Sequence, residues 1–270
     1  MKKKFFLSLL LFLLIQCAVF ANTIKFAQIS DAHFVKNDKY RTEVLEQAVK
    51  DINDESDIDF TIFTGDNLDA PHAEYLPDFI KIANRLNKPY YIVIGNHDVF
   101  RNNGLSKEQY LEIVRDNNTF YRYKKPNYVF KKNGFVFIVV DGAKEIIPGS
   151  NGYYKKETLD WLEKQLQKYD DKPVVIFQHF PLVADKEIKS HSVFQKEEYI
   201  NLLDSHDNVI SVIGGHLHIN SEIMRNGVYH ITTPTLLHNP PIYKIITITT
   251  TKGFSPMIYT ELKEVNMPKQ

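Results

Sequence analysis

The feature that most constrains the fold is a regular alternation of two kinds of segment along the chain. Short runs rich in β-branched and aromatic residues predict buried strands. Longer runs between them have the apolar spacing of amphipathic helices. The expected strands are 24–29, 59–63, 90–94, 135–140, 174–177 and 209–213, and the expected helices are 41–53, 74–87, 106–116, 157–168 and 195–204. This alternation is typical of an α/β domain.

Three further strands are expected near the end of the chain, at 228–232, 242–250 and 255–261, with no convincing helix among them. They indicate mixed sheets and not a purely parallel one. A content of 43% hydrophobic and 13% aromatic residues in 270 is enough for a substantial core. Because no repeat, low-complexity tract or linker interrupts residues 22–270, we expect a single domain there.

Residues 1–21 have the layout of a secretory signal peptide. Three lysines precede an apolar run, and Val19 and Ala21 stand three and one residues before a cut at Asn22. We therefore expect an exported protein, periplasmic or secreted, with no stable membrane span after cleavage. An uncleaved anchor is an alternative, since the apolar stretch borders on the ~20 residues that span a bilayer. Lipidation at Cys17 is another, although Gln16 stands where a small residue is wanted.

Composition excludes several kinds of partner and site. Cys17 is the only cysteine, so the processed chain would contain neither a disulfide nor a thiolate metal ligand. Lysine plus arginine equals aspartate plus glutamate at 33 each, and removal of Lys2, Lys3 and Lys4 leaves 30 basic against 33 acidic residues. A net charge of −3 by that subtraction gives no reason to expect a nucleic-acid polymer as partner.

Five polar segments follow directly after expected strands. They are Ser30-Asp31-Ala32-His33, Gly65-Asp66-Asn67, Gly95-Asn96-His97-Asp98, Gln178-His179-Phe180-Pro181 and Gly214-Gly215-His216-Leu217-His218. Taken singly, each polar residue could merely cap a helix or complete a turn. Taken together they indicate one site, because ligands bind in open α/β sheets beyond the carboxyl ends of the strands.

The residue types in these segments suit a metal centre. Asp31 and His33 are two apart, so in extended backbone their side chains leave on the same face and can share an ion, and His216 and His218 have the same spacing. Carboxylates, imidazoles and one amide without sulfur suit Mn²⁺, Fe²⁺, Zn²⁺ or Co²⁺. Seven such ligands are too many for one ion and suitable for two that share a carboxylate.

The ordered set of motifs resembles the calcineurin-like metallophosphoesterase superfamily. The matching motifs are Asp31-x-His33, Gly65-Asp66, Gly95-Asn96-His97-Asp98, His179 and Gly215-His216-x-His218, with support from Val140-Asp141 and Leu159-Asp160-Trp161-Leu162. The Gly-Asn-His-Asp form is most similar to the branch with the bacterial cyclic-nucleotide phosphodiesterases. The resemblance implies a four-layer αββα sandwich: two packed mixed β-sheets flanked by helices, with the metal site at the carboxyl ends of strands.

The resemblance also implies a role for each site residue. Asp31, His33 and His218 would hold the first metal, Asn96, His179 and His216 the second, and Asp66 would bridge the two. His97 would stand unliganded beside the substrate as a catalytic residue, with Asp98 hydrogen-bonded to it. A tyrosinate-bound ferric centre, as in purple acid phosphatases, is not expected, because Asn67, Leu68 and Asp69 follow Asp66.

These residues predict a metal-dependent hydrolase of small phosphate esters. Two cations lower the pKa of a shared water, which as hydroxide attacks phosphorus. Phosphodiesters are the first expectation, and phosphomonoesters such as nucleotides or sugar phosphates are the alternative. A third reading is a scaffold without catalysis, whose signature would be loss of His97 or of a metal ligand. Neither loss is seen.

The remaining candidates concern the pocket wall, which we expect at 67–75, 99–128, 142–154 and 181–194. Tyr121, Tyr123 and Tyr128 are interpreted as half-buried strand, with a substrate-stacking loop as the alternative. The histidines without ligand spacing are interpreted as surface or turn residues; they are His72, His191, His206, His230 and His238. Of these, His72 and His238 are the better candidates to reach the pocket, because both lie in proline-flanked loops.

Overall fold

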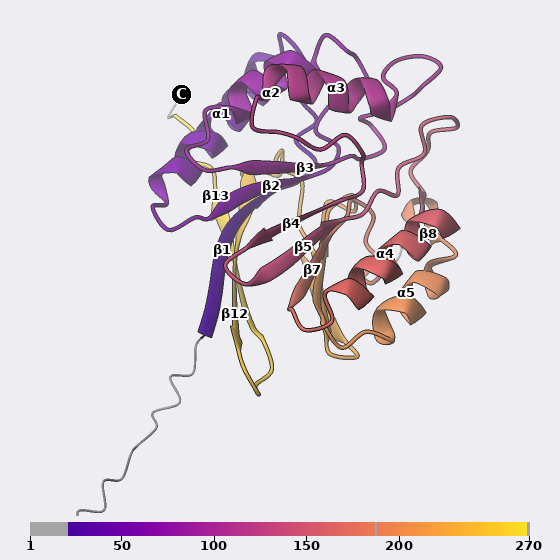
Figure 1. Cartoon of the computed structure of the whole chain (residues 1–270). Coiled ribbons are helices and arrows are strands. Elements are labelled where there is room, and N and C mark those ends of the chain that lie inside the picture. Colours follow the sequence, from indigo (N-terminus) through magenta and orange to yellow (C-terminus); the bar gives the residue numbers. More distant parts are fainter. Residues whose placement is uncertain (1–20, 187, 269–270) are drawn as a thin grey trace, which may run out of the picture.

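Two mixed β-sheets pack face to face, with helices on both outer sides (Figure 1). The computed structural model describes residues 21–186 and 188–268. The first sheet has the order β13 (Met257–Glu264), β12 (Ile242–Thr251), β1 (Ala21–Ile29), β2 (Phe60–Thr64) and β3 (Tyr90–Val93). The second has the order β10 (Ser221–Arg225), β11 (Val228–Thr232), β9 (Val209–Gly214), β7 (Val174–Phe177), β5 (Phe135–Val139) and β4 (Tyr128–Lys132). The expected sandwich is confirmed.

The helices cover the two outer faces separately (Figure 1). On the first sheet lie α1 (Lys39–Asp54), α2 (Leu76–Ala83) and α3 (Lys107–Asn117); on the second lie α4 (Lys156–Lys168) and α5 (Lys196–Asp204). The first turn of α1 is closed by the Asp38 side chain, which accepts from Arg41 N at 3.0 Å. Ser106 and Gln109 form a reciprocal cap on α3. Among the described residues, no helix is both long and apolar enough to cross a bilayer.

Strand alternation divides the core into a layer between the sheets and layers beneath the helices. In β1, Phe26 belongs to the cluster between the sheets, whereas Ala27 belongs to the cluster that includes the helices. The inter-sheet layer is largely aromatic: the rings of Phe26 and Phe60 stack at 4.8 Å, and Phe137 meets Phe60 edge-on at 5.1 Å. This packing fixes how the strand ends of one sheet face those of the other.

The parallel strands place their carboxyl ends at common edges. β1, β2 and β3 run parallel, and so do β5, β7, β9 and β11. The antiparallel neighbours β12, β13, β4 and β10 occupy the flanks. Because the five polar segments of the sequence follow β1, β2, β3, β7 and β9, both sheets contribute to one site.

Several sequence expectations differ from the structure. The helix expected over 74–87 is limited to Leu76–Ala83. Its start agrees with Pro77, which is tolerated only in a first turn. β4 and β10 were not expected as strands, and neither was the two-residue ladder of β6 (Gly152–Tyr153) with β8 (Val193–Phe194). Of the three tyrosines, only Tyr128 lies in a strand. The signal-peptide interpretation lies outside the described residues, apart from Ala21.

One buried histidine of the second sheet predicts acid sensitivity of the fold. His230 in β11 is 4% exposed, and within the described part of the chain its Nδ1 has no hydrogen-bond partner. Burial, with a contribution from Arg225, lowers its pKa to about 4. An unfolded chain binds a proton here below pH ~6.5 that the folded chain does not bind until about pH 4. The part of the free energy of unfolding that depends on neutral His230 is therefore fully present above pH 6.5 and is lost as the pH falls toward 4.

We expect His230→Phe to remove that part of the pH dependence. Between pH 7 and pH 5 the metal-free wild type should lose about 2 kcal/mol more of its free energy of unfolding than the variant. Urea titrations at the two pH values measure the difference. His72→Phe, at a 49% exposed side chain, is the control and should keep the wild-type slope. Equal slopes in the wild type and His230→Phe would contradict the prediction.

Candidate metal centre

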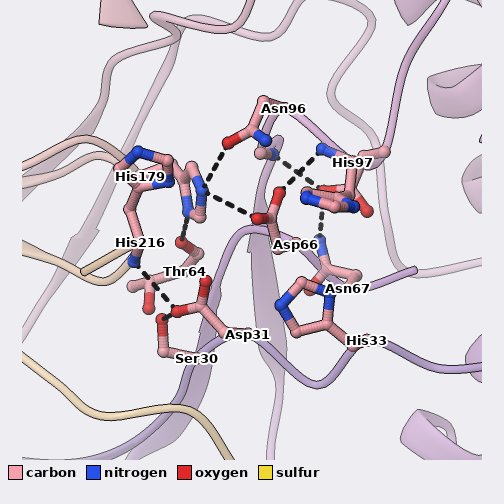
Figure 2. A network of polar contacts seen from close by, with 12 residues as sticks. Ser30, Asp31, His33, Thr64, Asp66, Asn67, Asn96, His97, His179 and His216 are labelled. Atoms are coloured by element: carbon pink, nitrogen blue, oxygen red, sulfur yellow. Dashed lines mark hydrogen bonds and ion pairs between the residues drawn. The ribbon is translucent and has the colours of Figure 1, made fainter. Parts of the chain in front are cut away.

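The seven predicted ligands meet in one place. Figure 2 shows Asp31, His33, Asp66, Asn96, His179 and His216 together, and His218 lies against Asp31. Asp31 and His33 follow β1, Asp66 follows β2, Asn96 follows β3, His179 follows β7, and His216 and His218 follow β9. Their donor atoms fall into compact groups: Asp31, His33 and His218 form one, and Asp66, His179 and His216 form another. Within each group the ligand atoms lie within 4.8 Å of one another.

Asp66 lies between the two groups. Its Oδ2 is 3.3 Å from His179 Nε2, and it also belongs to a third group with His33 and His97. Asn96 joins on the same side as His179, because its Oδ1 is 3.2 Å from His179 Nε2. On the other side, His218 Nε2 lies 3.2 Å from Asp31 Oδ1 and 3.3 Å from His33 Nε2. This geometry is that of two neighbouring ion positions with one carboxylate in reach of both.

The backbone at these ligands is held in an unusual conformation. Positive φ values occur at Asp31 (51°), His33 (42°), Asp66 (48°), His216 (69°) and His218 (54°). Such values cost roughly 1–3 kcal/mol each for residues with a Cβ, and they cluster at functional sites. Backbone hydrogen bonds hold two of the turns, since Asp31 N donates to Gly65 O at 3.0 Å and His33 N donates to Asp66 O at 2.9 Å.

Neighbouring groups orient the ligands. His179 Nδ1 donates to Thr64 O at 2.8 Å, which leaves Nε2 directed at Asp66 and Asn96 (Figure 2). Asp31 Oδ2 accepts from Ser30 Oγ at 2.5 Å and from His216 N at 3.0 Å. These contacts fix the tautomer of His179 and leave Asp31 Oδ1 facing the centre, as outer-shell partners of metal ligands do.

The chemical state of the donors fits bound cations. His216 is 5% exposed, and its Nε2 has no hydrogen-bond partner among the residues that the structure describes. Burial, followed by the charge of His179, lowers its pKa to about 3. The pKa of His33 is also lowered, mainly by burial. Both imidazoles are therefore neutral at physiological pH, which is the form that binds metals.

Two other histidines hold a proton more tightly than usual in the metal-free chain. Burial opposes protonation of His179, but the Asp66 carboxylate outweighs it and raises the pKa of His179 to about 9. The hydrogen bond to Asp31 likewise raises the pKa of His218 against the effect of burial. The same contacts hold the pKa values of Asp31 and Asp66 below the usual range, although burial opposes this. Cations that bind here would displace the two histidine protons.

The expected partnership of His97 with Asp98 is wrong. His97 Nδ1 donates to Asp69 O at 2.7 Å, and His97 N donates to Asp66 Oδ1 at 2.8 Å. The buried carboxylate of Asp98 instead accepts from Gly95 N at 2.7 Å, Leu68 N at 2.9 Å and Asn67 Nδ2 at 3.0 Å. Burial, together with the charge of Asp66, raises the pKa of Asp98 to about 7. Asp98 thus holds the two ligand loops together and does not orient the His97 ring.

The pocket above the ligands has a volume of about 190 Å³. Besides His97 and five of the seven ligands, it is lined by Ser150, Ile188, His191 and Leu217. The expected wall segments 142–154 and 181–194 thus contribute, whereas no described lining residue comes from 67–75 or 99–128. His191 was interpreted as a surface or turn residue. It lies with its ring 5.1 Å from that of His216, and no spacing in the sequence signals this.

The two histidines that sequence favoured for the pocket lie elsewhere. The ring of His72 packs on Tyr75 at 4.8 Å, and His238 Nδ1 is 3.2 Å from Pro240 O. The three tyrosines form an aromatic cluster of their own, in which Tyr123 stacks on Tyr128 at 3.9 Å. None of these residues lines the pocket, so the stacking-loop alternative for the tyrosines is not supported.

This fold and this ordered set of residues match a known class of protein. A family model described as calcineurin-like phosphoesterase matches residues 24–220. The chain belongs to this family, and it is a metal-dependent phosphoric ester hydrolase. Families of this kind depend on a dinuclear metal centre, which agrees with the two groups of ligand atoms.

Particular relatives have related activities. A protein of Arcobacter nitrofigilis named a probable glycerophosphodiester phosphodiesterase is 29% identical over 192 residues, 67% of this chain and 64% of the relative. A 3′,5′-cyclic-nucleotide phosphodiesterase of Nostoc sp. is 24% identical over 221 residues, 78% of each chain. The crystal structure of a dimetal phosphatase from Danio rerio matches with a TM-score of 0.65 and 17% identity, covering 87% of this chain and 98% of that one. At that identity the likeness concerns the fold.

A glycine beside the centre provides a test of its geometry. A Cβ at Gly95 would overlap the backbone nitrogen and Oδ1 of Asp66, so we expect Gly95→Ala to displace the carboxylate that both ion positions share. The variant should retain at most one metal ion per chain by elemental mass spectrometry after reconstitution. Gly149→Ala is the matched control, because the nearest atom to its Cβ is Lys144 Nζ at 3.4 Å. Two tightly held ions in Gly95→Ala would contradict this account of the site.

Proposed function

We propose that this protein is an exported dinuclear-metal phosphodiesterase acting on small phosphodiesters. The observation that carries the proposal is the convergence of two groups of donors, Asp31, His33 and His218 in one and Asp66, His179 and His216 in the other. Asp66 also groups with His33, and Asn96 Oδ1 joins at 3.2 Å from His179 Nε2. The first ion would be held by Asp31, His33 and His218, and the second by Asn96, His179 and His216. This donor set suits Mn²⁺, Fe²⁺, Zn²⁺ or Co²⁺.

Bound divalent cations would supply a hydroxide nucleophile at neutral pH and neutralise charge on the phosphoryl oxygens. The protein's own residues position the substrate. Because His97 Nδ1 is engaged by Asp69 O, the Nε2–H of its imidazolium form would be left to donate a hydrogen bond or the proton to the leaving oxygen. Such proton transfer contributes roughly 10²- to 10⁴-fold to the rate. Asp98 is a positioning residue in this scheme, since it fixes the loops that carry Asp66 and His97.

The charge of the pocket favours diesters over monoesters. The described lining of the metal pocket includes histidines, Asp66 and Asn96, but no lysine or arginine. A phosphomonoester dianion carries one more negative charge than a diester and gains most from permanent cations beside the metals. The two relatives are named as phosphodiesterases, which supports the same choice. A nucleic-acid polymer is not proposed as a substrate, because the chain has no excess of positive charge.

Export rests on the first 21 residues of the sequence. A lysine-rich start, an apolar run and small residues before Asn22 support cleavage by a signal peptidase. We expect a full-length chain expressed in a bacterial host to be recovered outside the cytoplasm with Asn22 as its first residue, as read by N-terminal sequencing. Recovery of the intact leader in the membrane fraction would favour the anchor, and a lipid on Cys17 would favour the lipoprotein.

We expect metal-stripped protein to regain hydrolysis of bis-p-nitrophenyl phosphate when Mn²⁺, Zn²⁺ or Mg²⁺ is restored. The value of kcat/KM for this diester should exceed that for p-nitrophenyl phosphate by at least tenfold. The physical reason is the absence of lysine and arginine from the described pocket lining. Release of p-nitrophenolate, followed by its absorbance, measures both reactions. A preference for the monoester would replace the proposal by the phosphomonoesterase alternative.

The variant His97→Ala, measured in the same assay, tests whether His97 acts in catalysis without binding a metal ion. It should keep both ions by elemental mass spectrometry and lose roughly 10²- to 10⁴-fold in kcat for the diester. His72→Ala, outside the pocket, is the control and should behave as the wild type. Unchanged turnover in His97→Ala would remove its proposed role.

A further inference from the structure

A second cavity adjoins the metal pocket. It has a volume of about 240 Å³ and shares three lining residues with the metal pocket, Ile188, His191 and Leu217. His191 lies at the end of a single 3-10 turn (Lys189–His191), and its Nδ1 is 2.9 Å from Ser190 Oγ. Leu217 stands between the two ligands His216 and His218. The two cavities therefore share part of their walls, and the second cavity lies directly beside the metal pocket.

The walls of the second cavity are largely aliphatic. Six of its lining residues are Pro181, Leu182, Ala184, Ile188, Val193 and Leu217; three lysines, a serine and His191 complete the lining. Leu182 and Val193 are buried, and Lys186 and Lys189 are exposed. Apart from histidine rings, no aromatic side chain lines either cavity in the described chain. The described lining therefore does not offer the broad Phe, Tyr or Trp ring on which nucleobases stack in many sites.

The size of each hollow indicates that a substrate occupies both. Cavities that enclose a whole small molecule measure roughly 300–1,000 Å³. The metal pocket, at about 190 Å³, and the second cavity, at about 240 Å³, are each smaller. The metal pocket contains the donors for a phosphoryl group, so the aliphatic cavity is left for one of its two ester substituents.

The position of His97 indicates which substituent this is. His97 stands beside His33, with ring centroids 4.9 Å apart, whereas the wall that the two cavities share includes His191, whose ring contacts that of His216. His97 and His216 lie on opposite sides of Asp66 in Figure 2. If His97 serves the leaving oxygen, the group beside His191 is the one that stays on phosphorus.

We propose that this cavity binds the retained alcohol of the substrate and selects an aliphatic one. We name it the alkyl subsite and define it by Leu182, Ala184, Ile188, Val193 and Leu217. The proposal rests on the phosphodiesterase function above and narrows its substrate class to alkyl phosphodiesters. Each methylene transferred from water to such walls is worth roughly a fourfold gain in binding. In the described lining, a nucleoside in this position would find no ring to stack on other than that of His191.

The test compares two substrates that differ only in the retained group. Hydrolysis of methyl or n-hexyl p-nitrophenyl phosphate releases p-nitrophenolate and leaves the alkyl phosphate. With Mn²⁺-loaded wild type we expect kcat/KM for the hexyl substrate to be at least tenfold higher. Ala184→Phe fills the subsite and should bring the ratio of the two values close to one, and Ala184→Leu should give an intermediate ratio. Ala73→Phe is the matched control on an exposed loop that lines neither cavity and should keep the wild-type ratio.

A binding measurement separates this proposal from the proposed function. Calorimetric titration of the Mn²⁺-loaded protein with n-hexylphosphonate and methylphosphonate requires no turnover. A hexyl preference of at least tenfold in Kd that disappears in Ala184→Phe supports the subsite, even if no diester is hydrolysed and the proposed function fails. Equal affinity for the two phosphonates in the wild type overturns the subsite. So does a hexyl preference that persists in Ala184→Phe.

Discussion

The burial of two neighbouring carboxylates is the constraint on which the structure depends. Asp31 is fully buried and Asp66 is 2% exposed, and an unpaired buried charge costs several kcal/mol. In the metal-free chain, His179, whose pKa is raised to about 9, lies against Asp66 and supplies positive charge, and His218, whose pKa is also raised, lies against Asp31. Divalent cations fill the same electrostatic role with more charge, so the protein is built around cations in either state.

This constraint also joins the two sheets. Asp31, Asp66 and Asn96 follow strands of the first sheet, while His179 and His216 follow strands of the second. Beneath them the buried side chain of Gln28 in β1 donates to Gly214 O at 2.9 Å across the sheets. A second link is the ion pair of Lys244 in β12 with Glu222 in β10 at 2.7 Å. The left-handed backbone at five ligands is sustained because these contacts hold both sides of the site.

Much of this arrangement could be predicted from sequence. The strands ending before Asp31, Asp66, Asn96, His179 and His216 were recognisable from their β-branched runs, and parallel strands bring such ends together. What could not be predicted depends on loops without periodicity. Sequence neighbours His97 and Asp98 point to different partners, because a turn after β3 separates their side chains. His191 reaches the pocket through a single 3-10 turn, whose path no motif encodes. The end of α2 at Ala83 and the flanking strands β4 and β10 were likewise not marked by any motif.

The ladder of β6 with β8 has a consequence for how this enzyme can diversify. Gly152 pairs with Val193 and Tyr153 with Phe194, so the segment that carries Ser150 and the one that carries Ile188 and His191 are fastened to each other. Neither segment supplies one of the seven ligands. Substitutions in these two segments can therefore reshape this wall of the pocket as a unit without changing the metal ligands. Related enzymes could in this way acquire different substrate specificities while they keep the same catalytic centre.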